Sequence, residues 1–212
     1  MKGSESGKNT DAPLVVIAIG GNSLIKDREH MDVLDQYRAA GETSYHIVPI
    51  VKRGYRVLVT HGNGPQVGFI LLRSEMARNV IHEVPLANCV ADTQGSIGLQ
   101  IAQSLQNELL RQGVDQQVVA LVTQTVVDEH DPSFSKPSKP IGPFMTEAEA
   151  RKHEKEDGWA VGEDAGRGWR RLAASPAPLK IIELAAIRTL LDSGALVIAA
   201  GGGGVPVIYK AD

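Results

Sequence analysis

The stretch that decides the fold is Leu14–Ile19, LVVIAI, which runs directly into Gly20-Gly21-Asn22. A short, continuous apolar run of this kind is typical of a strand buried on both faces of a parallel sheet. Two further stretches have the same form, Tyr55–Thr60 (YRVLVT) and Leu196–Ala200 (LVIAA). Both also lead toward glycine-rich segments. The chain therefore repeats one unit, an apolar strand that ends near a glycine-rich turn.

Helical stretches separate these strands. Apolar residues recur at helical spacing over four stretches, Met31–Lys52, Gln66–Arg78, Gly95–Gln112 and Ile181–Asp192. One more strand is predicted over Gln117–Val127. Strands and helices in alternation predict an α/β protein, with a mostly parallel sheet between two layers of helices. The expected fold class is thus a three-layer αβα sandwich.

The composition is that of a globular domain. The 212 residues include 42% hydrophobic and 22% charged side chains, which excludes wholesale disorder. The formal net charge of −3 argues against a surface for nucleic acid or for an anionic membrane. No apolar run approaches the roughly 18 residues that a membrane span needs. The single Cys89 cannot form an intrachain disulfide, which favours a reducing, cytoplasmic setting.

Two segments depart from the regular alternation. Residues 1–13 are polar and are interpreted as a flexible tail rather than a secretory signal. Residues 128–178 contain six of the 11 prolines and both tryptophans, and Thr146–Glu149 has the form of a capping box before a charged helix. This second segment is too long for a linker. It predicts a small subdomain that protrudes from the sheet and acts as a lid.

Three glycine clusters follow three of the predicted strands, at residues 20–22, 62–64 and 201–204. One glycine turn after a strand is common and would have no functional meaning by itself. In an open α/β sheet, however, ligands bind beyond the carboxyl ends of the strands. Glycine there lets backbone amides approach an anion, and the following helix N-termini add their dipoles. The spacing fits neither a P-loop nor a dinucleotide fingerprint, so an anion site of another design is predicted.

Two cationic side chains of the inserted segment are candidates for the same site. Lys139 lies among prolines, whose restrained backbone would hold its ammonium group in place. Arg167 belongs to a second basic group, together with Arg170 and Arg171. The ordinary alternatives are a solvated lysine and a charged surface. Lysine, arginine and backbone amides without an obvious base suit the transfer of a phosphoryl group to an acceptor that is already ionised.

Other kinds of site find no support in the sequence. The six histidines form neither an H-E-x-x-H motif nor a close pair, so no metal site is predicted. The G-x-S-x-G motif of many serine hydrolases is absent. Cys89 lies among small residues and is predicted to be a buried hydrophobic side chain.

Six segments in order along the chain resemble the carbamate kinases of the amino acid kinase family. The segments are Ala18–Asn22, His61–Gly68, Thr93–Gly98, Lys139–Phe144, Glu163–Arg170 and Gly201–Pro206. The first and last occur across the wider family, whereas KPIGPF and EDAGRGWR are more specific to carbamate kinases. The resemblance implies the amino acid kinase fold and a reversible reaction of ATP and carbamate to ADP and carbamoyl phosphate. In arginine breakdown such enzymes usually run toward ATP.

The resemblance also implies roles for particular residues. Gly20, Gly21 and Asn22 would hold the transferring phosphoryl group, and the cluster Gly62-Asn63-Gly64 would lie on the carbamate side. Lys139 would neutralise charge on the transferred group, with Arg167 as a second candidate for that role. Carbamate brings its own anionic oxygen, so no general base is needed. Mg²⁺ would arrive with the nucleotide, and a homodimer is implied.

Members of this family continue for about another third of a chain beyond the last glycine cluster, and that part holds most of the nucleotide pocket. Residues 14–212 are therefore expected to be the N-terminal part of the domain, with the nucleotide-binding lobe missing. Such a chain would expose an apolar sheet edge and have little kinase activity alone. One alternative is an inactive homologue that binds carbamoyl phosphate or acts as a regulatory subunit. A relative acting on another carboxylate is the other, disfavoured by the carbamate-kinase-type insertion.

Overall fold

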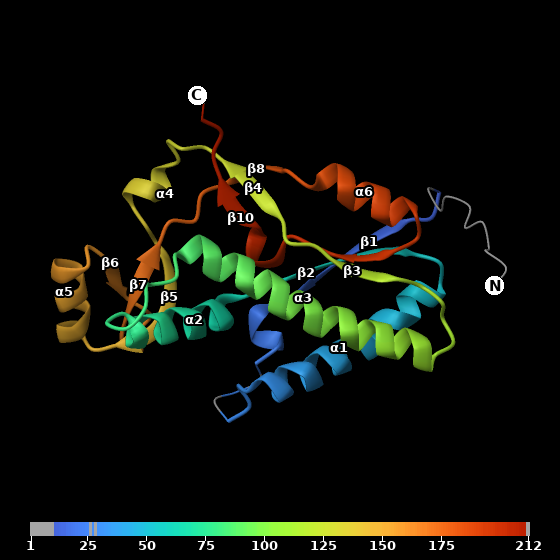
Figure 1. Ribbon diagram of the computed structural model, residues 1–212, viewed down its shortest axis with the longest axis horizontal. Coiled ribbons are helices and arrows are strands. Elements are labelled where there is room, and N and C mark those ends of the chain that lie inside the picture. Colours follow the sequence, from blue (N-terminus) through green and yellow to red (C-terminus); the bar gives the residue numbers. More distant parts are fainter. Residues whose placement is uncertain (1–10, 26, 28, 211–212) are drawn as a thin grey trace.

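The computed structural model describes residues 11–25, 27 and 29–210. A main sheet with helices on both faces forms the body, and a small sheet with its own helix lies at one end of the molecule (Figure 1). Residues 1–10 of the predicted flexible tail lie outside the described residues. Ala12 and Pro13, also assigned to the tail, are held to the core. Their carbonyl groups accept hydrogen bonds from the Arg56 side chain (2.9 Å) and amide (3.0 Å).

The main sheet is parallel and has the strand order β1-β2-β9-β3. Its strands are β1 (Leu14–Ile19), β2 (Arg56–His61), β9 (Leu196–Ile198) and β3 (Val118–Ala120). β9 is buried along its whole length, as the apolar run predicts. β1 is different, because it is the edge strand and exposes Leu14 and Val16 on one face. The prediction that β1 is buried on both faces is therefore wrong.

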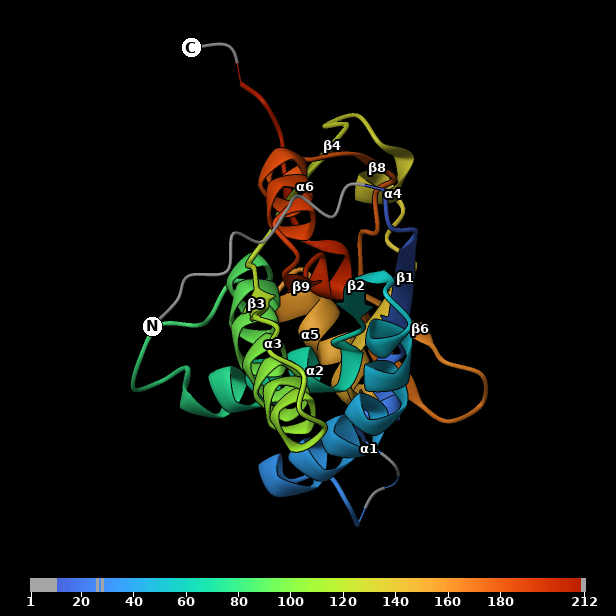
Figure 2. The ribbon, with the colours of Figure 1, turned by 90° about the vertical axis from the view of Figure 1, so that its right-hand side faces the viewer.

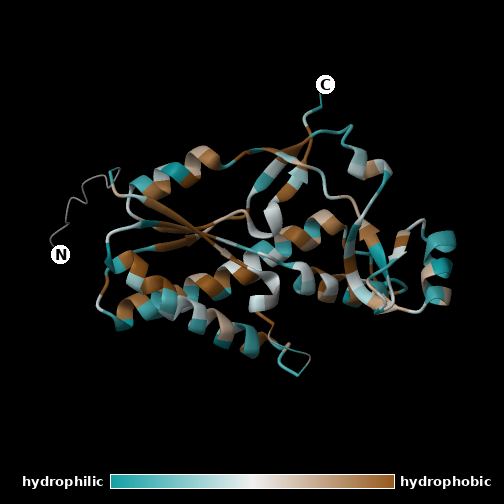
Figure 3. Ribbon diagram, turned by 180° about the vertical axis from the view of Figure 1, so that it is seen from behind, coloured by the Kyte–Doolittle hydropathy of each residue, from teal (hydrophilic) through white to brown (hydrophobic). Residues whose placement is uncertain are grey.

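Helices cover both faces of the main sheet. On one face lie α1 (Val33–Lys52) and α3 (Leu86–Arg111), side by side beneath the strands in Figure 2. On the other face lies α6 (Leu184–Asp192), whose Ile187 and Leu191 pack against β9. The brown, hydrophobic ribbon in Figure 3 follows the strands and the helix faces turned toward them. The predicted fold class, an αβα sandwich with a mostly parallel sheet, is confirmed.

The α3 helix begins earlier than the sequence pattern predicts. It starts at Leu86, directly after Pro85, whereas the prediction places its first residue at Gly95. The pattern rested on the apolar residues after Gly95, but the buried face continues upstream through Cys89, Thr93 and Gln94. Two of these three side chains are polar, so a search for apolar periodicity does not find them. Burial of Cys89, in contrast, is confirmed.

The predicted strand Gln117–Val127 is two strands in two different sheets. β3 ends at Ala120 in the main sheet, and β4 (Gln124–Val127) belongs to a second sheet of order β10-β4-β8. There β4 pairs with β10 (Val205–Val207) in parallel and with β8 (Pro178–Ile181) in antiparallel orientation. Ile181 is therefore a strand residue, and α6 begins at Leu184 rather than at Ile181. Leu179 on the outer strand β8 is exposed.

The segment between β4 and β8 contains a short helix α4 (Pro132–Ser135) and a third sheet of order β5-β7-β6. Its antiparallel strands are β5 (Lys139–Met145), β6 (Ala160–Glu163) and β7 (Trp169–Ala173). The helix α5 (Glu147–Glu156) begins with both hydrogen bonds of the predicted capping box, which is confirmed. We call residues 139–173 the subdomain.

Arginine–aromatic contacts hold the subdomain together. The guanidinium group of Arg151 lies 4.6 Å from the ring of Trp169, and that of Arg171 lies 4.6 Å from the ring of Trp159. Phe144 has the guanidinium groups of both Arg167 and Arg170 near its ring, at 5.3 and 5.1 Å. Such contacts contribute about 0.5–1 kcal/mol each at exposed positions. They supplement the few buried apolar side chains of this small sheet.

Candidate functional site

Three glycine-rich loops meet at one edge of the main sheet. β1, β2 and β9 are neighbours and run parallel, so the loops that follow them lie at the same, carboxyl end. These loops contain Gly20–Asn22, Gly62–Gly64 and Gly201–Gly204. The prediction that the three glycine clusters gather at one end of one sheet is confirmed. We call this place the glycine edge.

The first two loops touch through their backbones. The Gly62 amide donates a hydrogen bond to the Ile19 carbonyl at 2.8 Å. A Cβ atom on Gly62 would lie 2.5 Å from the Gly21 nitrogen, and one on Gly21 would lie 3.3 Å from the Asn63 nitrogen. Glycine is therefore required at position 62 by the crossing of two main chains, not by its own dihedral angles.

The second loop leads into a helix whose N-terminus belongs to the glycine edge. α2 (Gly64–Ala77) begins at Gly64, with Asn63 as its N-cap residue and proline in the first turn. The first amides of a helix have no partners within the helix, and its dipole favours a negative charge at this end. Gly64 therefore stands at a positive helix end, an arrangement suited to an anion, whereas the Gly62 amide is already bonded to Ile19.

The third loop is a tight turn with an unusual backbone. After β9, Ala200 has a φ of 54°, and Gly202, Gly203 and Gly204 have φ values of 63°, 93° and 87°. The turn's own hydrogen bonds run from the amides of Gly203 and Gly204 to the carbonyls of Ala200 and Gly201, at 3.0 Å each. The amides of Gly201 and Gly202 take no part in these bonds. Successive backbone amides of this kind form anion-binding concavities.

Side chains from the end of β2 and from the loop that follows it fill the space against this turn. A Cβ atom on Gly201 would overlap the His61 ring, and one on Gly202 would overlap the Asn63 carboxamide. Asn63 cannot simply move aside, because it is buried and its Nδ2 donates to the Thr93 hydroxyl at 3.0 Å. The second and third loops are therefore packed against each other as closely as the first and second.

Threonine hydroxyls fix the carbonyl groups of the turn. Thr60 Oγ1 donates to the Ala200 carbonyl at 3.0 Å, and Thr125 Oγ1 donates to the Gly203 carbonyl at 2.6 Å. Sequence reasoning missed Thr60 and Thr125, because single threonines in strands carry no functional signal. It also missed Thr93, although Thr93 is the first residue of the matching segment Thr93–Gly98.

His61 is buried beside the turn in its neutral form. Burial lowers its pKa, since the charged imidazole would lose its hydration. Nδ1 lies 3.0 Å from the Gly62 carbonyl, which only accepts, so the ring proton is on Nδ1. Nε2 then presents a lone pair to the glycine turn.

We expect the protein to lose stability as the pH falls below 6.5, the ordinary pKa of the histidine side chain. The unfolded chain takes up a proton there, which the buried imidazole of the folded state resists, so protonation favours unfolding. Chemical unfolding between about pH 7.5 and about pH 5.5 measures this loss. In a His61→Asn variant the loss of stability over this range is smaller. Equal losses in both proteins contradict the prediction.

The two predicted cations lie near opposite ends of β5, Lys139 within the strand and Arg167 outside it. Lys139 is the first residue of the strand, exposed and opposite Ala173. Arg167 lies in the turn between β6 and β7, where its Nη2 is 3.0 Å from Asp164 and its guanidinium faces Phe144 near the other end of β5. The structure therefore does not bring Lys139 and Arg167 together. Their roles stay predictions.

The subdomain reaches the core along α2. Gly68, one turn into α2, lies against Gly142 of β5, since a Cβ atom on Gly68 would be 3.5 Å from the Gly142 Cα. The Gly142 carbonyl accepts a hydrogen bond from Arg170 Nε at 3.1 Å, which joins the KPIGPF and EDAGRGWR segments. β5 thus passes beside the first turns of the helix whose N-terminus belongs to the glycine edge.

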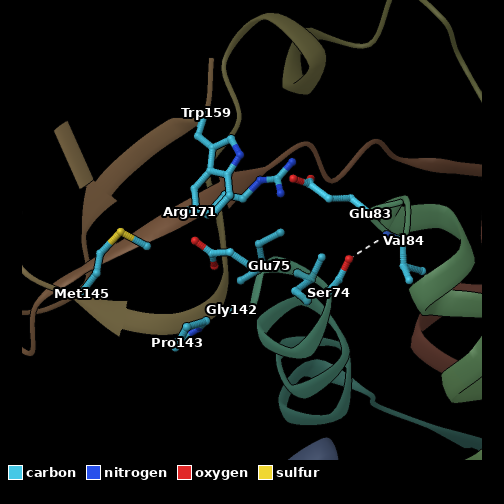
Figure 4. Close-up of a pocket in the computed structure, with 11 residues that line it drawn as sticks. Ser74, Glu75, Glu83, Val84, Gly142, Pro143, Met145, Trp159 and Arg171 are labelled. Carbon is cyan, nitrogen blue, oxygen red and sulfur yellow. Dashed lines mark hydrogen bonds between the residues drawn. The ribbon is translucent and has the colours of Figure 1, made fainter. Parts of the chain in front are cut away.

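A cleft between the other half of α2 and the subdomain is separate from the glycine edge (Figure 4). Ser74 and Glu75 of α2 face Trp159 and Arg171 of the subdomain across it. His153 closes this junction with Nε2 at 3.2 Å from Glu75 and its ring stacked on Trp159. The cleft lies at the attachment of the subdomain, and none of the predicted site residues lines it.

The described part of the chain shows neither a membrane-spanning helix nor a cluster of metal ligands. Within residues 11–25, 27 and 29–210, no helix has the length and apolar character to cross a membrane. Within the same residues, no group of three or more histidine, cysteine, aspartate or glutamate side chains could hold a metal ion.

Known proteins resemble this chain over nearly its whole length. A model of the amino acid kinase family matches residues 13–210. A carbamate kinase of Pyrococcus horikoshii is 48% identical over 198 residues, covering 92% of this chain and 63% of the relative. A carbamate kinase-like protein, YahI of Escherichia coli, is 47% identical over 198 residues, with 92% and 62% covered.

A solved structure agrees with these relatives. The carbamate kinase from Giardia lamblia bound to AMP-PNP superposes with a TM-score of 0.85 at 41% identity, covering 94% of this chain and 64% of that one. The chain thus spans somewhat less than two thirds of the length of the relatives it matches. With its fold, its glycine edge and this family match in agreement, the chain belongs to the amino acid kinase family.

Proposed function

We propose that the chain has the chemistry of a carbamate kinase, the reversible transfer of a phosphoryl group between ATP and carbamate. The observation that carries the proposal is the glycine edge, where three loops present backbone amides and a helix N-terminus to one place. The similarity to carbamate kinases supports it. A catalytically inactive carbamoyl-phosphate-binding or regulatory homologue is not favoured, because the matched relatives bear the name of the enzyme.

In this mechanism the backbone does most of the electrostatic work. The amides of the loops at Gly20–Asn22 and Gly201–Gly202 face the oxygens of the transferring phosphoryl group, and those of Asn63 and Gly64 face the carbamate side, whereas the Gly62 amide joins the first two loops. Fixed dipoles of this kind need no reorganisation as charge moves in the transition state. The anionic oxygen of carbamate attacks the γ-phosphorus of ATP while the bond to the bridging oxygen breaks and ADP leaves, so no side chain has to remove a proton.

Two cations complete the proposal. The ammonium group of Lys139 would approach the transferred group from β5 and offset its negative charge. Arg167 is the second candidate, although its guanidinium is engaged by Asp164 at 3.0 Å in this arrangement. Charge–charge contacts with a phosphoryl group are strongest where water is excluded. A closing subdomain would provide that exclusion, which is the role of a lid.

The nucleotide and Mg²⁺ belong to the same proposal. The Giardia lamblia relative is named as bound to AMP-PNP, which supports ATP and ADP as substrates. The contacts described at the glycine edge offer amides, hydroxyls and a carboxamide. They do not fit an Mg²⁺ ion held by protein carboxylates, the ligands it prefers. No step is therefore assigned to the metal, and its arrival with the nucleotide remains a proposal.

Three further features rest on the resemblance to carbamate kinases alone. They are a homodimeric assembly, a cytoplasmic location and a place in arginine breakdown. The expectation that these 212 residues make little ATP by themselves is likewise a prediction.

The proposal is tested by measuring the binding of carbamoyl phosphate to the 212-residue chain with titration calorimetry. We expect binding by the unchanged protein and an affinity about tenfold lower in a Lys139→Ala variant, the loss typical of one charged hydrogen bond. Lys136→Ala is the matched control, since Lys136 is also exposed but precedes β5. Absence of binding by the unchanged protein contradicts the proposed function.

The same preparation is then supplied with ADP and Mg²⁺, and ATP is measured by luminescence. Binding without ATP formation agrees with the expectation that the nucleotide site needs further residues. Rapid ATP formation contradicts that expectation and strengthens the proposed function. Equal affinity in the Lys139→Ala and Lys136→Ala variants removes Lys139 from the site.

A further inference from the structure

We propose that Gln94 and Thr123 are positioning residues, which together hold the glycine turn at residues 201–204 in its anion-binding shape. The inference rests on the proposed function, because it concerns the same site. Neither side chain is among the residues predicted from the sequence. Both are buried and neutral, with 3% and 0% of their surface exposed.

Thr123 holds both ends of the turn. Its Oγ1 accepts a hydrogen bond from the Ala200 amide at 3.1 Å, and its carbonyl accepts one from the Val205 amide at 2.9 Å. Ala200 precedes the turn and Val205 follows it. A single residue therefore determines the separation of the two ends, and with it the path of the glycines between them.

Gln94 in turn holds Thr123 through three hydrogen bonds. Its Oε1 accepts from the Thr123 amide and from the Thr123 hydroxyl, both at 2.9 Å, and its Nε2 donates to the Thr123 carbonyl at 3.2 Å. Because the hydroxyl proton points to Gln94, a lone pair of Oγ1 is left to accept from Ala200. Gln94 thus sets the direction of the hydroxyl that holds the turn.

The turn needs such support because its backbone is strained. Ala200 has a φ of 54°, a region that disfavours residues with a Cβ atom because this atom crowds the following carbonyl oxygen. Strain of this kind persists only where the surroundings impose it. A Cβ atom on Gly201 would lie 3.0 Å from Gln94 Cγ, so the aliphatic part of Gln94 also packs under the turn.

The place of Thr123 explains why this control is possible. It lies where the chain leaves the main sheet after β3 and enters the second sheet at β4, and the glycine turn makes the same crossing from β9 to β10. The two crossings are bonded to each other, and α3 contributes the side chain that fixes both. Thr93, next to Gln94 on α3, holds Asn63 of the second loop by the 3.0 Å bond described above.

The test compares Thr123→Val with Thr123→Ser. Valine keeps the shape but removes the hydroxyl, whereas serine keeps the hydroxyl. The first readout is the amide resonances of Gly201–Gly204 in protein labelled with ¹⁵N-glycine, and the second is the affinity for carbamoyl phosphate. We expect Thr123→Val to shift these resonances and to weaken binding about tenfold. Thr123→Ser keeps the resonances in place and restores the affinity to within about threefold.

A second pair of variants keeps the proposal testable if a substitution at Thr123 prevents folding. Gln94→Met removes the three bonds, and Gln100→Met changes another buried glutamine of the same helix, whose Oε1 has no partner among the described residues. We expect the glycine resonances to shift in Gln94→Met and not in Gln100→Met. Thermal unfolding of all four variants separates loss of stability from displacement of the turn.

The proposal is overturned if Thr123→Val and Gln94→Met lower the unfolding temperature but leave the Gly201–Gly204 resonances in place, because both residues then act only in stability. It is overturned as well if serine and valine at position 123 weaken binding equally. Failure of the unchanged chain to bind carbamoyl phosphate contradicts the proposed function alone. In that case the glycine resonances still decide whether Gln94 and Thr123 position the turn.

Discussion

Replacement of Gly62 by alanine is expected to destabilise the protein and to abolish binding of carbamoyl phosphate. The added methyl group would lie 2.5 Å from the Gly21 nitrogen. Because this neighbour is main chain and not the end of a flexible side chain, the loop at Gly20–Asn22 has to move. Overpacking of this kind costs about 1–3 kcal/mol, and we expect the upper end. In a domain of this size about 3 kcal/mol lowers the unfolding midpoint by roughly 6–12 °C.

Gly41→Ala is the matched control, because Gly41 lies inside α1 and has nothing within 4 Å of an added Cβ atom. Alanine there gains roughly 0.5–1 kcal/mol, since glycine is a poor helix former. The two substitutions should therefore change the unfolding temperature in opposite directions, and only Gly62→Ala should change binding. A Gly62→Ala protein as stable as the original would show that the two loops do not touch.

The second large effect is expected at Gly202. Gly202 and Gly203 both have positive φ values, 63° and 93°, so alanine is strained at either position. They differ in their surroundings, since a Cβ atom on Gly202 would overlap the Asn63 carboxamide and one on Gly203 meets nothing within 4 Å. Backbone strain alone costs roughly 1–2 kcal/mol. Gly202→Ala must also break the bond from Asn63 to Thr93, a further loss of about 1 kcal/mol.

Urea unfolding and titration with carbamoyl phosphate measure the two parts of this effect. We expect Gly202→Ala to be the less stable variant and to bind more weakly than Gly203→Ala, because it displaces Asn63, which we propose lies on the carbamate side. If the two variants are equally stable, the contact between Asn63 and the turn does not contribute. If Gly203→Ala binds more weakly, the anion depends on the turn more than on Asn63.

The sequence predicts the main sheet and the meeting of the glycine clusters at one end of it, for a physical reason. β2 and β9 are apolar runs that end at glycine clusters, and parallel strands bring such ends together whatever lies between them. The burial of β1 could not be predicted, because the apolar run Leu14–Ile19 reads the same whether the strand is central or at the edge. Only the strand order places it at the edge and exposes Val16.

The buried polar side chains around the glycine edge cannot be predicted from a pattern of hydrophobic residues. Thr93 and Gln94 precede the apolar stripe of α3, so the predicted helix began after them. Thr123 lies in the middle of the segment Gln117–Val127, which the sequence pattern predicts to be one strand. What separates β3 from β4 is a set of hydrogen bonds between residues 29 positions apart in sequence, from Gln94 to Thr123. The local sequence around either residue does not indicate that the two are paired.

The two predicted cations show a different limit of prediction from sequence, because their residue type is known but their positions are not. Lys139 and Arg167 were selected by charge and by resemblance, and charge does not say where a side chain lies. The register of β5 with β7 places Lys139 opposite Ala173 and Met145 opposite Trp169, which separates the two candidates by the length of the strand. Residue type predicts what a group can do, whereas register decides which groups can do it together.

The proposed binding of an anion by main-chain groups has a consequence for the evolution of the site. A side-chain ligand disappears with one codon, but an amide belongs to every residue except proline and survives most substitutions. The glycine at position 62 is required for lack of space, and the glycine at position 202 both for lack of space and for its positive φ. Under the proposed function, mutations around the glycine edge would change the acceptor side while the main-chain phosphate site is retained.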